Sequence, residues 1–127
     1  RLKKVHYDFV DTSAVTSLYN MFSSMDKLEE ITGLENFDVS NVTSMERMFI
    51  SDYSLTKVSG VSNWNTKSVY NLTDMFYRCY ALIDVTELTN WGRNSFIINC
   101  YNACIICAER ICLTWYAFIN NRKRVFS

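Results

Sequence analysis

Cysteine is the residue type in this sequence with the greatest capacity for chemistry, and four of the five cysteines cluster at Cys100, Cys104, Cys107 and Cys112. Three thiolates spaced by three and then two residues could converge on an iron–sulfur cluster with one iron position left open. On a helix, however, the same spacing places them on one apolar face, where free cysteine behaves as a small hydrophobic side chain. An odd number of cysteines does not fit a closed disulfide framework either. We expect structural cysteines, with a disulfide or metal site and then a redox cluster as the alternatives.

The remaining residues do not form a recognisable catalytic set. The spacing of Cys100, Cys104 and Cys107 matches that of radical S-adenosylmethionine enzymes, but those enzymes need a large barrel that 127 residues cannot supply. His6 is the only histidine, and no partner set is identifiable that would make it a general acid or base. The 13 Lys and Arg residues balance 13 Asp and Glu residues, so no net field attracts nucleic acid or an anionic membrane. We therefore predict that the chain is not an enzyme and binds no cofactor, metal or nucleic acid.

The chain is dominated by an internal repeat of 27 residues. Asp11 to Phe37, Asp38 to Trp64 and Asn65 to Trp91 align as three lines without a gap. Matches at so many positions with one spacing indicate a stacked repeat protein, because a single unit cannot bury its apolar faces alone. The matched columns are Val15/Val42/Val69, Leu18/Met45/Leu72, Met21/Met48/Met75, Phe22/Phe49/Phe76, Leu28/Leu55/Leu82, Ile31/Val58/Val85, Leu34/Val61/Leu88, Asn36/Asn63/Asn90 and Phe37/Trp64/Trp91.

Each repeat contains two hydrophobic periodicities. Val42, Met45 and Phe49 follow the i, i+3, i+7 spacing of one face of a short helix, and Ser40 and Asn41 are good N-cap residues for it. The segment from 55 to 61 is rich in β-branched residues and too short for a stable helix, so we predict a short strand there. One helix and one strand in 27 residues is the unit of a leucine-rich-repeat solenoid, an α/β repeat fold.

Stacking of such units makes three further predictions. In-register neighbours lie roughly 4.7–4.9 Å apart along a strand ladder. We therefore expect an asparagine ladder at the turn after each strand, an aromatic spine beside it, and outer-face charges of alternating sign that attract their neighbours. The corresponding columns are Asn36/Asn63/Asn90, Phe37/Trp64/Trp91 and Glu30/Lys57/Asp84.

The second repeat resembles the BspA-like leucine-rich-repeat family of surface proteins, from Asp38-Val39-Ser40-Asn41-Val42-Thr43-Ser44-Met45 through Met48-Phe49 to Leu55, Val58, Val61, Asn63 and Trp64. In the third repeat, residues 75–79 carry the family's M-F-x-x-C step, whereas Met25 and Asp52 replace its cysteine, Cys79, in the other two. The resemblance covers residues 11–91. It implies a right-handed solenoid on secreted or cell-surface proteins, a role in adhesion and partner binding, and no catalytic residues to carry over.

The repeat divides the chain into three parts. Residues 1–10 are predicted to be the remnant of a preceding repeat or an amino-terminal strand, and residues 11–91 the three-repeat solenoid. In residues 92–127 the register fails, which predicts an atypical, helical tail. A capping element, a membrane anchor followed by Arg122-Lys123-Arg124, and a non-native sequence are the alternatives for this tail. Because the chain begins with Arg1, we interpret it as a fragment of a longer protein.

These observations favour a non-catalytic interaction module that contacts a host, matrix or neighbouring-cell protein through the exposed strand face. A structural spacer on the cell surface is the alternative, and a cysteine-bound metal or iron–sulfur site in the tail is a third hypothesis. The candidate contact residues are those that the repeat leaves variable around the predicted strands: Glu29, Glu30, Thr32, Thr56, Lys57, Ser59, Asp84 and Thr86.

Overall fold

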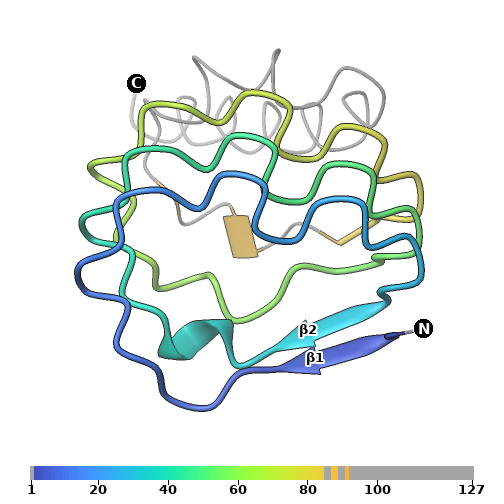
Figure 1. Ribbon diagram of the computed structural model, residues 1–127, viewed down its shortest axis with the longest axis horizontal. Coiled ribbons are helices and arrows are strands. Elements are labelled where there is room, and N and C mark those ends of the chain that lie inside the picture. Colours follow the sequence, from blue (N-terminus) through green and yellow to red (C-terminus); the bar gives the residue numbers. More distant parts are fainter. Residues whose placement is uncertain (1, 85–86, 89–90, 92–127) are drawn as a thin grey trace, which may run out of the picture.

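The computed structural model describes residues 2–84, 87–88 and 91 (Figure 1). The elements that lie wholly within these ranges are two short strands, β1 (Lys4–His6) and β2 (Glu30–Thr32), and one turn of 3-10 helix, η1 (Leu34–Asn36); residues 87–88 are also in 3-10 conformation. The two strands pair in parallel, with Val5 opposite Ile31. The rest of the described chain winds in successive 27-residue rungs that lie over one another (Figure 1). We call residues 11–37, 38–64 and 65–91 the first, second and third rung.

The predicted leucine-rich-repeat solenoid, with one helix and one strand per repeat, is wrong. The described part of the chain contains no α-helix. The segments expected to be helical have left-handed backbone at two positions in every rung, and L-residues in that conformation interrupt a right-handed helix. The positive φ angles lie at Asn20, Arg47 and Asp74 and, four residues later, at Ser24, Ser51 and Arg78.

A row of tight turns stands where the helix was expected. We call these segments, residues 17–25, 44–52 and 71–79, the turn ladder. Their N–H groups alternate between two kinds of acceptor: Met48 donates to the Met45 carbonyl of the same rung (3.2 Å), whereas Phe49 donates to the Met75 carbonyl of the next rung (2.9 Å). Because this alternation satisfies the buried backbone while tying the rungs together, it replaces the hydrogen bonds of a helix. The other bonds from one turn to the next start at Leu18, Asn20, Phe22, Ser24, Met45, Arg47 and Ser51.

Among the described residues, the strand predicted in each repeat is present only in the first rung, as β2. At the equivalent position of the second and third rungs, the described chain shows a single parallel bridge between Lys57 and Asp84. Side chains hold the rungs together nearby. The Glu87 carboxylate accepts three backbone N–H groups, from residues 60, 61 and 62, at 2.9, 3.1 and 3.2 Å. The third rung is thus fastened to the second without a continuous strand ladder.

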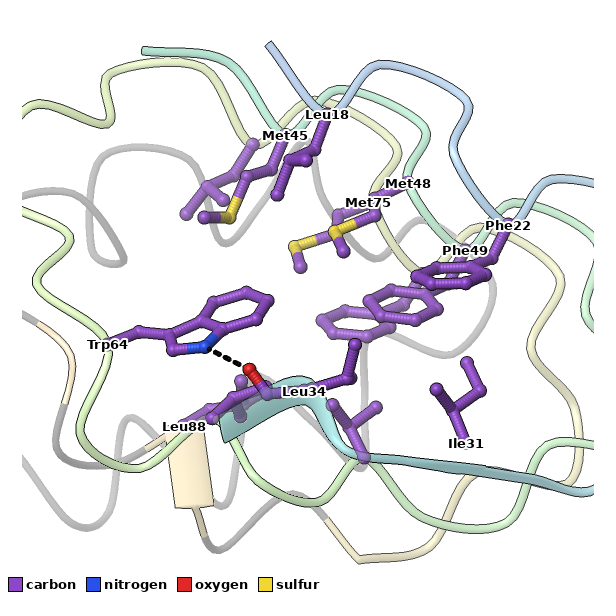
Figure 2. Close-up of a cluster of buried hydrophobic side chains, with 14 of the residues drawn as sticks. Leu18, Phe22, Ile31, Leu34, Met45, Met48, Phe49, Trp64, Met75 and Leu88 are labelled. Carbon is purple, nitrogen blue, oxygen red and sulfur yellow. Dashed lines mark hydrogen bonds between the residues drawn. The ribbon is translucent and has the colours of Figure 1, made fainter. Parts of the chain in front are cut away.

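The core lies between the turn ladder and the β2 side of the rungs (Figure 2). The rings of Phe22, Phe49 and Phe76 stack through the three rungs, with centroids 5.5 and 5.4 Å apart. Most of the matched apolar columns are buried here, although Met21 at the outer rung is 37% exposed. Burial of stacked rings and aliphatic side chains is the main favourable contribution to the stability of the stack.

The aromatic column predicted beside the asparagines forms a stack. Phe37 and Trp64 lie 6.4 Å apart and Trp64 and Trp91 lie 5.9 Å apart, measured between ring centroids. The indole N–H of Trp64 donates to the Leu34 carbonyl of the preceding rung at 2.9 Å (Figure 2). Each tryptophan therefore adds a hydrogen bond between rungs to its apolar burial, since Trp91 makes the same bond to the rung before it (2.9 Å).

The predictions for the asparagine column and for the tail are covered by the structure to different extents. The Asn36 side chain donates to the Tyr7 carbonyl (3.0 Å), whereas Asn63 is exposed and Asn90 lies outside the described residues. All predictions for the tail, including those for Cys100, Cys104, Cys107 and Cys112, also fall outside the described residues. Within the part of the chain that the structure covers, no helix has the length and apolar character needed to cross a membrane.

Candidate functional site

The predicted contact residues lie along the β2 side of the stack, which we call the strand face. Glu29, Glu30, Thr56 and Lys57 are exposed there. Thr32, Ser59 and Asp84 are partly buried, and Thr86 lies outside the described residues. The parallel register of β1 and β2 and the bridge between the second and third rungs bring these side chains to one face.

The charges of the strand face are paired between rungs. Lys4 Nζ lies 3.4 Å from a carboxylate oxygen of Glu30, and Lys57 Nζ lies 3.8 Å from one of Asp84. All four side chains are at least one-third exposed, and such exposed pairs contribute little to stability. They do, however, neutralise four of the charges of the face, while the exposed carboxylate of Glu29 is in neither pair.

Two hydroxyl groups of the strand face form hydrogen bonds with neighbouring residues. Thr32 Oγ1 lies 2.7 Å from His6 Nδ1, and Ser59 donates to the Ile31 carbonyl at 3.3 Å. Thr56, by contrast, is exposed, and its carbonyl accepts the backbone N–H groups of residues 83 and 84. The second rung therefore presents Thr56 and Lys57 as the most accessible predicted contact residues.

A second surface group lies at the corner between the turn ladder and the strand face. The rings of Tyr53 and Tyr80 stack in parallel, with centroids 5.6 Å apart and an interplanar angle of 6°. The Arg78 guanidinium carbon lies 5.3 Å from the centroid of the Tyr77 ring. Hydrogen bonds donated to Tyr77 and Tyr53 raise the pKa of Arg78. We call these four residues the tyrosine–arginine cluster.

Sequence reasoning missed the tyrosine–arginine cluster. Tyr53 and Tyr80 are one repeat apart, so their common column was the available signal. That column lies outside the predicted helix and strand, and the first rung has Asp26 there. The predicted contact residues all come from columns around the predicted strands, and none comes from the turns between elements.

One ionisable side chain is buried in the turn ladder. Asp52 has no exposed surface, and its Oδ1 accepts the Met25 backbone N–H at 2.9 Å. Its Oδ2 is buried and has no hydrogen-bond partner among the described residues. Burial raises the pKa of Asp52 to about 7, and the bond from Met25 opposes that rise. In the third rung the same position holds Cys79, whose thiol donates to the Phe49 carbonyl at 2.9 Å.

Neither Asp52 nor His6 belongs to a catalytic arrangement in the described residues. His6 is exposed, and its Nε2 lies 3.2 Å from the Asp8 carboxylate. No group of three or more His, Cys, Asp or Glu side chains in the described ranges is arranged to hold a metal ion.

Together these features define a protein of stacked 27-residue rungs with two surface groups on one scaffold. The chain belongs to the family described as "Mycoplasma protein of unknown function, DUF285", which matches residues 3–104. No curated protein and no solved structure matches the chain. Because the family description contains no activity, the function has to be argued from the surfaces of the molecule.

Proposed function

We propose that the chain is a non-catalytic interaction module that binds a host, matrix or neighbouring-cell protein through its strand face. The observation that carries this proposal is that each rung combines repeated residues of the core with variable residues on its surface. Most residues of the repeated columns are buried and pack against neighbouring rungs, whereas Glu29, Thr56 and Lys57 are exposed and differ from rung to rung. A rigid scaffold with variable outward residues is the arrangement that repeat proteins use to recognise partners.

The resemblance to BspA-like surface proteins supports a location at the cell surface or outside the cell. The residues that carry the resemblance are Asp38 to Met45 with Met48, Phe49, Leu55, Val58, Val61, Asn63 and Trp64, and residues 75–79 of the third rung. They build the scaffold rather than the strand face, so they support the class of protein and not a particular partner.

A structural spacer is the second candidate function, and one observation favours it. Four charged residues of the strand face pair with one another, Lys4 with Glu30 and Lys57 with Asp84. Charges that are already paired need no partner protein to neutralise them. A spacer would have no measurable affinity for any protein.

Binding to a panel of extracellular-matrix proteins, measured by surface plasmon resonance with residues 1–127 immobilised, separates the two functions. We expect saturable binding to at least one of the proteins. The double variant Thr56→Ala, Lys57→Ala should weaken it at least about tenfold, which corresponds to about 1.4 kcal/mol. Lys67→Ala, a change at another exposed position, is the matched control and should leave the affinity unchanged.

Two results would count against the strand face. If the wild-type chain binds no member of the panel, the spacer becomes the better description. If it binds but the double variant binds equally well, the module function stands and its contact surface lies elsewhere.

A further inference from the structure

We infer that the tyrosine–arginine cluster is a second contact surface, fitted to an acidic segment of a partner protein. It consists of Tyr53, Tyr77, Arg78 and Tyr80 and lies at the corner of the second and third rungs. It is separate from the strand face, and its role does not require binding there.

The fold does not need these side chains. Residues 24, 51 and 78 have nearly the same left-handed backbone, with φ angles of 58°, 62° and 64°, yet the first two are serines. Tyr77 likewise occupies a position that holds Ser23 in the first rung and Ile50 in the second. Because the rungs adopt one backbone with small or aliphatic residues here, folding does not account for an arginine beside a tyrosine.

The cluster is ordered before any partner arrives. Tyr53 and Tyr80 stack on each other while remaining 40% and 55% exposed. The Arg78 guanidinium lies against Tyr77, with its carbon 5.3 Å from the centroid of that ring. Tyrosine and arginine are the residue types that most often dominate binding energy in protein interfaces. Side chains that are already fixed lose less conformational entropy when they bind.

The charge of Arg78 points to an acidic partner. Arg47 pairs with Asp74 (4.0 Å) and Lys57 pairs with Asp84 (3.8 Å), but Arg78 forms no ion pair with another described residue. Its planar guanidinium presents paired N–H donors that match the two oxygens of a carboxylate. An Asp or Glu side chain of a partner would therefore complete the cluster.

A protein segment fits the cluster better than a glycan or a nucleic acid. Sugars stack on open aromatic faces, but one face of Tyr53 and one of Tyr80 are covered by each other, with the rings only 6° from parallel. Binding of nucleic acid draws on several cations along the phosphate backbone, and Arg78 is the one cation of this cluster. Hydroxyl groups, ring edges and one guanidinium are suited to the carboxylates and apolar side chains of a peptide.

An NMR titration of the ¹⁵N-labelled chain of residues 1–127 tests this surface. The probe is the acetylated and amidated peptide Glu-Glu-Phe-Glu-Glu, and the peptide Gln-Gln-Phe-Gln-Gln is its neutral control. We expect the acidic peptide to shift the amide resonances of Tyr77, Arg78 and Tyr80, with saturation in the millimolar range. The neutral peptide should bind with at most one-tenth of the affinity of the acidic peptide, because it cannot form an ion pair with the guanidinium.

Variants of Arg78 then measure its contribution to binding. Arg78→Gln should lower the affinity for the acidic peptide at least about tenfold. Arg78→Lys keeps the charge but loses the planar guanidinium, so its affinity should lie between those of the wild type and Arg78→Gln. Lys67→Gln, at an exposed position outside both surfaces, should leave the affinity unchanged. An unchanged dispersion of the amide spectrum confirms that each variant is folded.

The proposal is overturned if the acidic and neutral peptides shift the same resonances equally, if Arg78→Gln binds as tightly as the wild type, or if no resonance of the cluster moves. Shifts confined to Thr56 and Lys57 would also overturn it while supporting binding at the strand face. Failure of this surface is thus distinguishable from failure of the interaction module.

Discussion

The substitution Gly33→Ala should destabilise the amino-terminal edge of the stack by about 3 kcal/mol, since it combines a disfavoured backbone with a backbone clash. Gly33 has a φ of +87°, which alanine adopts only with strain. An added Cβ would collide with the carbonyl group and nitrogen of Tyr7, and backbone atoms cannot rotate away. The Tyr7 N–H donates to the Thr32 carbonyl, and the Asn36 side chain donates to the Tyr7 carbonyl. Tyr7 therefore cannot move away from the added Cβ without breaking these hydrogen bonds.

Urea unfolding and amide exchange of Tyr7 together measure this effect. The Tyr7 N–H donates to the Thr32 carbonyl, so detachment of β1 should accelerate its exchange by about two orders of magnitude for 3 kcal/mol. Gly60→Ala is the matched control, because Gly60 has a φ of +84° but its added Cβ would meet Glu35 Oε2 at 2.5 Å and the Glu35 backbone nitrogen only at 3.0 Å. The flexible side chain can move and the backbone contact is much less close than that with Tyr7, so we expect a smaller loss, of about 1–2 kcal/mol. Equal losses for the two alanines would show that contact with Tyr7 is not the cause.

The second large effect is a loss of stability with rising pH that comes from Asp52. Its pKa is about 7 in the folded chain, against an ordinary value of 3.8, so the folded state binds the proton more tightly than the unfolded state. Stability from this group is therefore fully present below about pH 4 and is lost as the pH rises through about 7. At about 1.4 kcal/mol for each pKa unit, the chain should be less stable at pH 8.5 than at pH 5 by about 3 kcal/mol.

Urea unfolding of the wild type and of Asp52→Asn at pH 5 and pH 8.5 tests this prediction. The variant keeps an oxygen to accept the Met25 N–H but has no charge to bury, so its stability should change far less between the two pH values. Glu29→Gln, at an exposed carboxylate, should retain the full pH dependence. A wild-type stability that is flat or rises between pH 5 and pH 8.5 would contradict a buried, ionising Asp52.

Two other carboxylates with shifted pKa values, those of Asp11 and Asp38, do not affect the stability change between pH 5 and pH 8.5. Hydrogen bonds from the Ser13 side chain and backbone lower the pKa of Asp11, and those from Ser40 lower the pKa of Asp38. Groups with a lowered pKa contribute stability that is present above about pH 4 and lost below it. Because their effect falls outside the range from pH 5 to pH 8.5, Asp11 and Asp38 do not contribute to the change within that range.

The spacing of the repeat could be predicted because packing imposes it. Phe22, Phe49 and Phe76 occupy one column since three rings stack through the rungs, and a polar residue there would open the core. Trp64 and Trp91 repeat for a second reason, since each donates a hydrogen bond back to the preceding rung. Side-chain columns of this kind are visible in a single sequence.

The local backbone could not be predicted, because the side chains at its decisive positions do not share a type. Left-handed φ angles occur at Asn20, Arg47 and Asp74, and only Asn and Asp are enriched in that region. The apolar spacing of Val42, Met45 and Phe49 fits one helix face, but it fits a row of turns with inward side chains equally well. Hydrogen bonds to the next rung decide between them, and they depend on residues 26 positions away.

The candidate surfaces were predictable in part. Exposure of Glu29, Glu30, Thr56 and Lys57 agrees with their place outside the apolar columns. The pairing of Lys4 with Glu30 depends on a strand register that a single sequence does not reveal. The tyrosine–arginine cluster depends on how Arg78 meets the stacked tyrosines at a turn, and no periodicity marks such a turn.

The central claim is that hydrogen bonds between turns of successive rungs, rather than helices, build the rigid scaffold that presents both surfaces. NMR scalar couplings across hydrogen bonds measure this directly. We predict couplings from the amide nitrogens of Met45, Arg47 and Phe49 to the carbonyl carbons of Asn71, Thr73 and Met75, 26 residues further along the chain. Couplings from each of residues 46–49 to the carbonyl four residues before it would instead reveal a helix and contradict the scaffold described above.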